Sequence, residues 1–316
     1  PYKVTSALTC APEGVLFALG FDDDPKKKGE PDEALLKEAV EAAAKADVAV
    51  LFVGLPEWKE SEGFDRTDMR LPDDQNELIR RVAQVNKNVV VVLHIGSPVE
   101  MPWAGDVTGI LAMQLGGEAV GAATVDLLYG KANPCGKLAE TFPLRLEHTP
   151  SYLNFPGWRD TVCYAEGVFV GYRYYTTKKM DVLFPFGHGL SYTTFQYSNL
   201  RLSADRITDR DTLTVSLDVT NTGDRFGKEI VQIYVAPPKD GEIMRPAREL
   251  RAFEKVALEP GETKTLTFTL DKRAFAYYSA IMGDWLVESG EYTVVAARSS
   301  ADTSLAAPVF VEATVR

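Results

Sequence analysis

The sequence predicts a doubly wound α/β domain followed by an all-β sandwich. Up to about residue 130, apolar runs alternate with stretches whose apolar residues recur at the helical period, which is typical of a parallel sheet covered by helices. From about residue 195 the helical period disappears, and short alternating runs are separated by turn residues, as in a β-sandwich. The length of 316 residues suits two domains of ordinary size.

The α/β part is expected to begin with a short apolar strand at residues 14–21. A helix should follow from residue 31, because acidic residues favour the start of a helix and apolar residues then recur along one face. The apolar run at 47–54 does not alternate, so we expect a strand that is buried on both sides. These segments form a βαβ unit, whose crossover should be right-handed.

The same pattern repeats along the chain. A helix that starts near 71–75 leads to a second buried strand at 88–94, and a third strand at 109–113 leads to a helix at 119–128. The two glycines before this last helix could cradle an anion, but without a lysine they favour tight packing of strand on helix.

After Gly130 the sequence becomes rich in turns, glycine and aromatic residues. The stretch 152–175 could line a sugar site, although a surface connection pinned by its rings is the favoured interpretation. We therefore expect an α/β domain with its linking segment over 1–194 and a fibronectin type III-like sandwich over 195–316. The strands expected in the sandwich lie at 213–220, 229–235, 249–253, 264–270 and 290–296.

Composition excludes several classes of function. The net charge of -11 argues against nucleic acid and anionic membrane as partners, and no apolar run reaches the roughly 18 residues of a membrane span. The three cysteines and three histidines are widely scattered, so we expect no disulfide framework, no metal site and no cofactor. These residues are Cys10, Cys135, Cys163, His94, His148 and His188.

The ten residues Glu57–Arg66 hold three glutamates, an aspartate, an arginine and a tryptophan. They follow the strand at 47–54, and ligands of open α/β sheets bind at the carboxyl ends of the strands. Composition alone favours a solvated acidic loop. A second loop at 96–101 follows the next strand and should lie at the same edge of the sheet.

Several motifs occur in a specific order. Ser61-Glu62-Gly63-Phe64-Asp65-Arg66 is followed by Gly96-Ser97-Pro98-Val99-Glu100-Met101-Pro102-Trp103, and then by turn-rich or aromatic motifs at 133–138, 169–175 and 184–192. Together they resemble the C-terminal part of glycoside hydrolase family 3, the β-glucosidase and β-xylosidase group. The similarity covers nearly the whole chain, and the set of motifs is highly specific although no single motif is.

The resemblance implies retaining hydrolysis by two carboxyl groups, which lie about 5–5.5 Å apart in such enzymes. On this match Glu62 would be the general acid and base, with Glu60 as its main rival and Glu57 as the next. The acid must start protonated, so burial or the neighbouring nucleophile should raise its pKa.

The resemblance also suggests roles for the residues around Glu62. Gly63 would allow a sharp turn of the backbone. Asp65 and Arg66 would form a pair that holds the loop, which is favoured over direct substrate contact. Trp58 would stack on a sugar at the leaving-group side, or would only pack.

In the family the nucleophilic aspartate belongs to an N-terminal (β/α)8 barrel, in a motif like Ser-Asp-Trp that we do not find here. The sheet also lacks a first strand that the family places upstream, and the chain begins with Pro rather than Met. The chain is therefore expected to be the acid/base-bearing part of a retaining, exo-acting β-glycosidase. The barrel would be in a second chain or in a missing fragment.

The expected substrates are β-glucosides or oligosaccharides with terminal non-reducing β-D-glucosyl residues. The alternative is a non-catalytic structural or carbohydrate-binding module; a flavodoxin-like nucleotide binder would need a phosphate loop. The absence of Asn-x-Ser/Thr acceptors and of paired cysteines favours a bacterial protein, either cytoplasmic or secreted. Two questions stay open: whether the sugar is glucose or xylose, and whether the protein forms a homo-oligomer.

Overall fold

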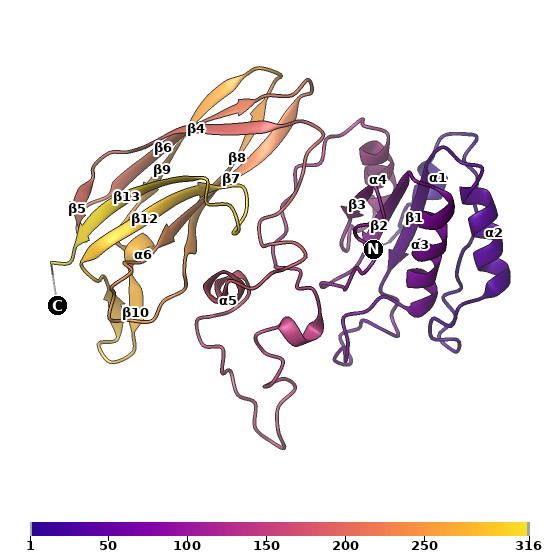
Figure 1. Ribbon diagram of the computed structural model, residues 1–316, viewed down its shortest axis with the longest axis horizontal. Helices are drawn as coiled ribbons and strands as arrows, with labels where there is room; N and C mark the ends of the chain where they lie inside the picture. The colour runs from indigo at the N-terminus through magenta and orange to yellow at the C-terminus, as the bar shows by residue number, and fades with distance from the viewer. Residues whose placement is uncertain (1, 315–316) are drawn as a thin grey trace. The chain divides into compact units, whose positions relative to one another are not determined.

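The computed structural model describes residues 2–314 and divides the chain into two compact units (Figure 1). The first unit extends to Ala132 and includes residues 144–146, and the second comprises residues 133–143 and the chain from Glu147 onward. By its contacts the linking segment is grouped with the β-sandwich. The expected domains, 1–194 and 195–316, stay a prediction.

The first unit is built on a parallel sheet with strand order β1–β2–β3. Its strands are β1 (Ala49–Gly54), β2 (Val89–His94) and β3 (Gly109–Ala112). The central strand β2 is the most deeply buried, because its Val91, Val92 and Leu93 are fully covered. The predicted alternation of apolar strands and helices is thus confirmed.

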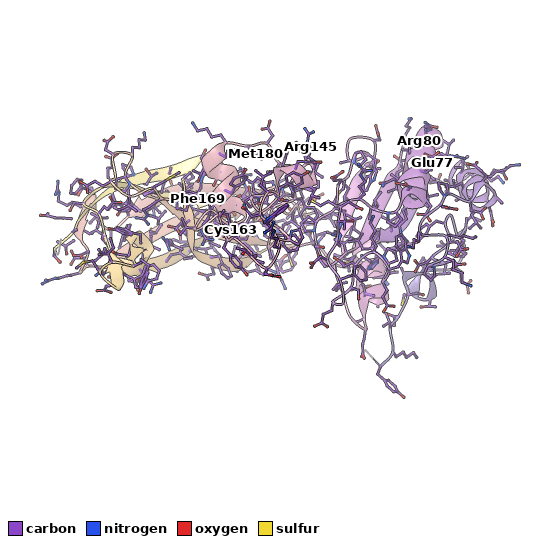
Figure 2. All side chains as sticks on the ribbon, turned by 90° about the horizontal axis from the view of Figure 1, so that it is seen from below. Glu77, Arg80, Arg145, Cys163, Phe169 and Met180 are labelled. Carbon is purple, nitrogen blue, oxygen red and sulfur yellow. The ribbon has the colours of Figure 1, made fainter. Side chains whose placement is uncertain are left out.

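Four helices accompany this sheet, and α2 packs beside α3 while α1 packs beside α4. Asp32 caps α2 by accepting hydrogen bonds from the backbone N–H groups of Ala34 and Leu35, which explains why the helix starts there. On α3, Glu77 and Arg80 form a surface ion pair (Figure 2). The helices are α1 (Ala7–Cys10), α2 (Glu33–Ala43), α3 (Asp73–Val85) and α4 (Val120–Leu128).

The strand expected at residues 14–21 is not formed. This stretch has no strand partner, and Val15, Leu16, Phe17 and Leu19 are all exposed. An apolar sequence can only become a strand where a neighbouring strand accepts its backbone hydrogen bonds. In the sheet, β1 pairs only with β2, and residues 14–21 do not pair with the other edge of β1.

The second unit contains a β-sandwich, as predicted, with all five expected strands present (Figure 1). One sheet has the order β5–β13–β12–β7–β8 and the other the order β4–β6–β9. The strands are β4 (Phe195–Leu202), β5 (Arg206–Thr208), β6 (Leu213–Asn221), β7 (Gly227–Ala236), β8 (Glu249–Leu258), β9 (Thr263–Leu270), β12 (Gly290–Ala297) and β13 (Leu305–Glu312). A short helix, α6 (Lys272–Phe275), precedes the hairpin of β10 (Tyr277–Ser279) and β11 (Asp284–Leu286).

The core of the sandwich follows from the alternation of its strands. In β6, Leu213, Val215, Leu217 and Val219 are fully buried, while the residues between them are partly exposed. Because side chains of a strand point alternately to its two faces, this pattern fixes which face of β6 meets the other sheet.

The linking segment is fastened to the sandwich by aromatic and polar contacts. Tyr172, at the start of helix α5 (Tyr172–Lys178), stacks on Phe186 at 4.7 Å and meets Tyr234 of β7 edge-on at 5.8 Å. The Gln232 side chain donates to the Gly187 carbonyl at 3.1 Å. These contacts explain why the compact second unit begins so far before its first strand.

Part of this segment departs from expectation. The stretch before α5 is not pinned by its rings, because Trp158 is 77% exposed and Tyr164 84% exposed. Leu153 is 90% exposed as well. The rings of Tyr172 and Tyr175, in the helix itself, are buried.

Across residues 2–314 the three cysteines are free, and no His, Cys, Asp and Glu side chains gather as a metal site would require. None of the helices described is both long and apolar enough to cross a bilayer.

Candidate active-site loop

The acidic loop and its neighbour leave the sheet at the same edge, as expected. β1 and β2 run parallel, with Gly54 opposite His94, so both strands end at the same level. The backbone N–H of Leu55 donates to the His94 carbonyl at 3.1 Å. A Cβ atom at Gly54 would overlap this carbonyl, so only glycine allows the close approach at the start of the loop.

Glu60 joins the two loops. Its Oε2 accepts the Gly96 backbone N–H at 2.8 Å, and its Oε1 accepts the Ser97 hydroxyl at 2.5 Å. A Cβ atom at Gly96 would lie 2.9 Å from Oε2, so a larger residue would displace the carboxylate. Both carboxylate oxygens of Glu60 are therefore committed to positioning the second loop.

Arg66 completes this connection from the far end of the acidic loop. Its Nη1 donates to the Ser97 hydroxyl at 2.7 Å and to the Pro98 carbonyl at 3.2 Å, and lies 3.9 Å from Glu60 Oε1. Burial lowers the pKa of Arg66, against the opposing effect of Glu60 and Asp68. The Nε and Nη2 atoms are buried without a hydrogen-bond partner among the described residues.

The contacts of Arg66 within residues 2–314 are with Ser97, Pro98 and Glu60, and none of these contacts involves Asp65. Asp65 is exposed, whereas Arg66 turns to Ser97 and Glu60. Loop residues adjacent in sequence commonly point in different directions, so proximity along the chain did not identify the partner. The loop-holding role expected for Arg66 is compatible with its contacts.

Glu62 lies at the tip of the loop. Ser61 and Phe64 form an isolated antiparallel bridge, which leaves Glu62 and Gly63 as the two residues of the turn. The Glu62 side chain is exposed, and within residues 2–314 no hydrogen bond or ion pair holds it. The burial expected around the acid is thus not provided by this chain.

Gly63 is not required by the geometry of this turn. Its φ lies outside the left-handed region, and a Cβ atom there would meet nothing within 4 Å. The sharp-turn explanation for this glycine therefore does not apply.

The stem of the loop is fixed by an ion pair that sequence reasoning missed. Lys59 Nζ lies 2.9 Å from the Asp68 carboxylate. Burial raises the pKa of Asp68, but hydrogen bonds from Lys59 and from the Arg70 backbone N–H outweigh it and lower the pKa. Trp58, beside Lys59, is half-buried, and its Nε1 is buried without a partner among the described residues.

The comparisons with known proteins identify the family. Residues 5–192 match the model of the glycosyl hydrolase family 3 C-terminal domain, and residues 229–300 match a fibronectin type III-like domain. The chain belongs to glycoside hydrolase family 3.

Its relatives include named enzymes. It is 56% identical over 285 residues to thermostable beta-glucosidase B of Acetivibrio thermocellus, covering 90% of this chain and 38% of that protein. It is 47% identical to an exo-alpha-(1->6)-L-arabinopyranosidase of Bifidobacterium breve, over 99% of this chain and 41% of that protein. The chain thus spans about two fifths of these relatives.

Solved structures agree with this assignment. A GH3 beta-glucosidase of Bifidobacterium adolescentis superimposes with a TM-score of 0.92 at 47% identity, over 99% of this chain and 46% of that one. The Kluyveromyces marxianus beta-glucosidase in complex with glucose superimposes with a TM-score of 0.84 at 44% identity, over 90% of this chain and 34% of that one.

Proposed function

We propose that this chain supplies the general acid and base, Glu62, of a retaining β-glycosidase. The nucleophilic aspartate would lie on a (β/α)8 barrel outside the chain. The observation that carries the proposal is the contrast between the glutamates of one loop. Glu60 is fixed by two hydrogen bonds, whereas Glu62 projects from a turn with its carboxyl group unengaged by residues 2–314.

This contrast bears on the choice among the rival acids. A general acid must exchange a proton with the leaving oxygen and then with water. Proton uptake by Glu60 would disrupt its hydrogen bonds to Gly96 and Ser97 and loosen the second loop. Glu57 is exposed but lies before the matched motif, in the turn that leads from β1. Glu62 is the candidate best suited to proton transfer.

The proposed reaction divides the work between two carboxyl groups. The barrel aspartate would attack the anomeric carbon while Glu62 protonates the departing oxygen, and Glu62 would then take a proton from the water that hydrolyses the glycosyl-enzyme. The contacts of Glu60, Ser97 and Arg66 would hold the stem of this loop while its tip meets the substrate. The barrel would supply the burial that Glu62 needs to start protonated.

A β-glucoside is the favoured substrate. The Acetivibrio thermocellus relative, which is 56% identical, is named a beta-glucosidase, whereas the Bifidobacterium breve arabinopyranosidase is 47% identical. We infer that the enzyme acts on terminal, non-reducing β-D-glucosyl residues, with the sugar held mainly by the barrel. Trp58 would flank the leaving group.

The test begins with the native preparation. Intact-mass analysis, with an assay on p-nitrophenyl β-glucoside, would establish whether a barrel accompanies this chain. In the assembled enzyme, Glu62→Gln should lower kcat by about 10²–10⁴-fold. Glu57→Gln is the matched control and should retain most of the activity. Full activity of the Glu62→Gln enzyme would refute the assignment.

A further inference from the structure

The second unit contains a cavity of about 440 Å³ between residues 150–169, helix α5 and the loop that precedes β8. All of its lining residues belong to this one unit. The volume is within the range of small-ligand sites. The side chains that matter here are Phe169 (Figure 2), Tyr174, Met244, Asn154, Glu166 and Lys178.

Two aromatic rings line the cavity. Phe169 and Tyr174 are half-buried, so each ring keeps accessible surface. The Tyr174 ring meets the Tyr175 ring edge-on, with 5.3 Å between the ring centroids. Lys178 Nζ donates a hydrogen bond to the Tyr174 hydroxyl at 2.8 Å. The C–H face of a sugar ring can pack against the accessible part of the Phe169 ring. Lys178 Nζ lies 5.0 Å from the centroid of the Tyr174 ring, so this ring presents an ammonium group beside its apolar surface.

The polar groups of the cavity are of mixed type. Within residues 2–314 no side-chain hydrogen bond engages the carboxylate of Glu166 or the amide of Asn154, and both groups line the cavity. Lys178 adds an ammonium group. Glu166 would repel an anionic ligand and Lys178 a cationic one, because each would bring like charges together. A neutral polyol, which both donates and accepts hydrogen bonds, suits all three groups.

We propose that this cavity binds a neutral sugar at a site separate from the Glu62 loop. The cavity chemistry calls for a polyol with one apolar face, and the choice of a glucosyl residue rests on the proposed function. Because few polar groups contact the ligand, binding should be weak, with a Kd on the order of 1 mM. Such a site would retain the glucosyl chain of an oligosaccharide near the enzyme.

Exposed apolar side chains in the stretch before α5 allow a competing use of this region. Leu153, Trp158 and Tyr164 are largely exposed, and a large apolar surface commonly contacts another protein domain. The cavity itself differs from that surface, since it combines rings with a free carboxylate, a free amide and an ammonium group. This mixture favours sugar over protein as the occupant.

The test is a titration of the full chain with methyl β-D-glucoside and with cellobiose, followed by saturation-transfer NMR and calorimetry. Glu166→Ala should weaken binding about 10-fold or more and Asn154→Ala about 2- to 10-fold, because a hydrogen bond to a charged group contributes more than one to a neutral amide. Asp160→Asn, in the same stretch but outside the cavity, is the matched control. Circular dichroism and thermal unfolding would verify that every variant is folded.

The outcomes separate this inference from the proposed function. Binding that survives in Glu62→Gln and is lost in Glu166→Ala would support the cavity. If Glu62→Gln abolishes sugar binding while the cavity variants keep it, the sugar binds at the catalytic loop and the cavity site is overturned. No binding by the wild-type chain would also overturn it, even if the barrel-containing enzyme hydrolyses glucosides. Variants that weaken association with the barrel but not sugar binding would identify a docking surface instead.

Discussion

The Arg66 guanidinium donates to the Ser97 hydroxyl at 2.7 Å, although 31 residues separate them in the sequence. The same hydroxyl donates to Glu60, so one serine links both ends of the acidic loop to the end of β2. Glu62 projects from the turn between these two fixed ends. The position of the candidate acid therefore depends on a residue of another loop.

Ser97→Ala tests this dependence. The change leaves one oxygen of the Glu60 carboxylate and one donor of Arg66 without their partner, which should cost about 1–3 kcal/mol of unfolding free energy. In the assembled enzyme kcat should fall, because the loop that carries Glu62 is less well positioned. Urea unfolding and steady-state kinetics would measure the two effects.

Ser97→Thr keeps the hydroxyl and serves as the control. It should retain more activity than Ser97→Ala if the hydroxyl links the loops. Equal activity of Ser97→Ala and the wild type would contradict the positioning role.

Gly187→Ala should strongly destabilise the second unit. Gly187 has φ 81°, and a Cβ atom there would overlap the Gln232 side chain, which is buried between the linking segment and the sandwich. We expect a loss of about 3 kcal/mol or more, since crowding adds to backbone strain. Thermal and urea unfolding would measure it.

The control is Gly261→Ala, at a turn with φ 76° and nothing within 4 Å of the added Cβ atom. Gly261→Ala should therefore lose only about 1–2 kcal/mol of stability, which is the backbone strain of a left-handed alanine. If the two variants lose the same stability, the contact with Gln232 does not restrict residue 187.

The stability of the first unit should depend on pH partly because of Asp74. Burial, with smaller effects of Asp23 and Asp73, raises the pKa of this carboxyl from 3.8 to about 6. The folded state therefore holds its proton more tightly than the unfolded state. Stability from this group is greatest below pH 4, falls as the pH rises from about 4 to 6, and is constant above that.

Asp74→Asn removes the loss of stability that ionisation of Asp74 causes, and it keeps an oxygen that can accept the Gln75 backbone N–H. The variant should be more stable than the wild type at pH 7 by about 1–3 kcal/mol, and the gain should shrink by pH 4. Denaturant unfolding across this pH range would show it. A gain that is the same at both pH values would point to another cause.

The sequence predicted the regular elements well because their patterns are local. The alternation in β6 and the apolar run in β2 each record which faces are buried, and this information lies within a few residues. The failure at residues 14–21 has the opposite origin. An apolar run gives strand propensity but does not supply the neighbour that a strand requires.

The candidate site was predictable in position but not in its contacts. Parallel topology alone placed the loops after β1 and β2 at one edge of the sheet. The partner of Arg66 could not be read in the same way, because side-chain direction in loops depends on tertiary contacts. For the same reason the motif suggested Asp65, while the fold selected Ser97 and Glu60.

The most direct test of the central claim is the leaving-group dependence of Glu62→Gln in the assembled enzyme. Without its acid, the enzyme should lose about 10²–10⁴-fold of kcat/KM on cellobiose, whose leaving group must be protonated. On 2,4-dinitrophenyl β-glucoside, whose leaving group departs unprotonated, the loss should be below about 10-fold by the same reasoning. Added azide should raise kcat by attacking the glycosyl-enzyme without needing a base. Equal losses on both substrates, with no effect of azide, would contradict Glu62 as the acid and base.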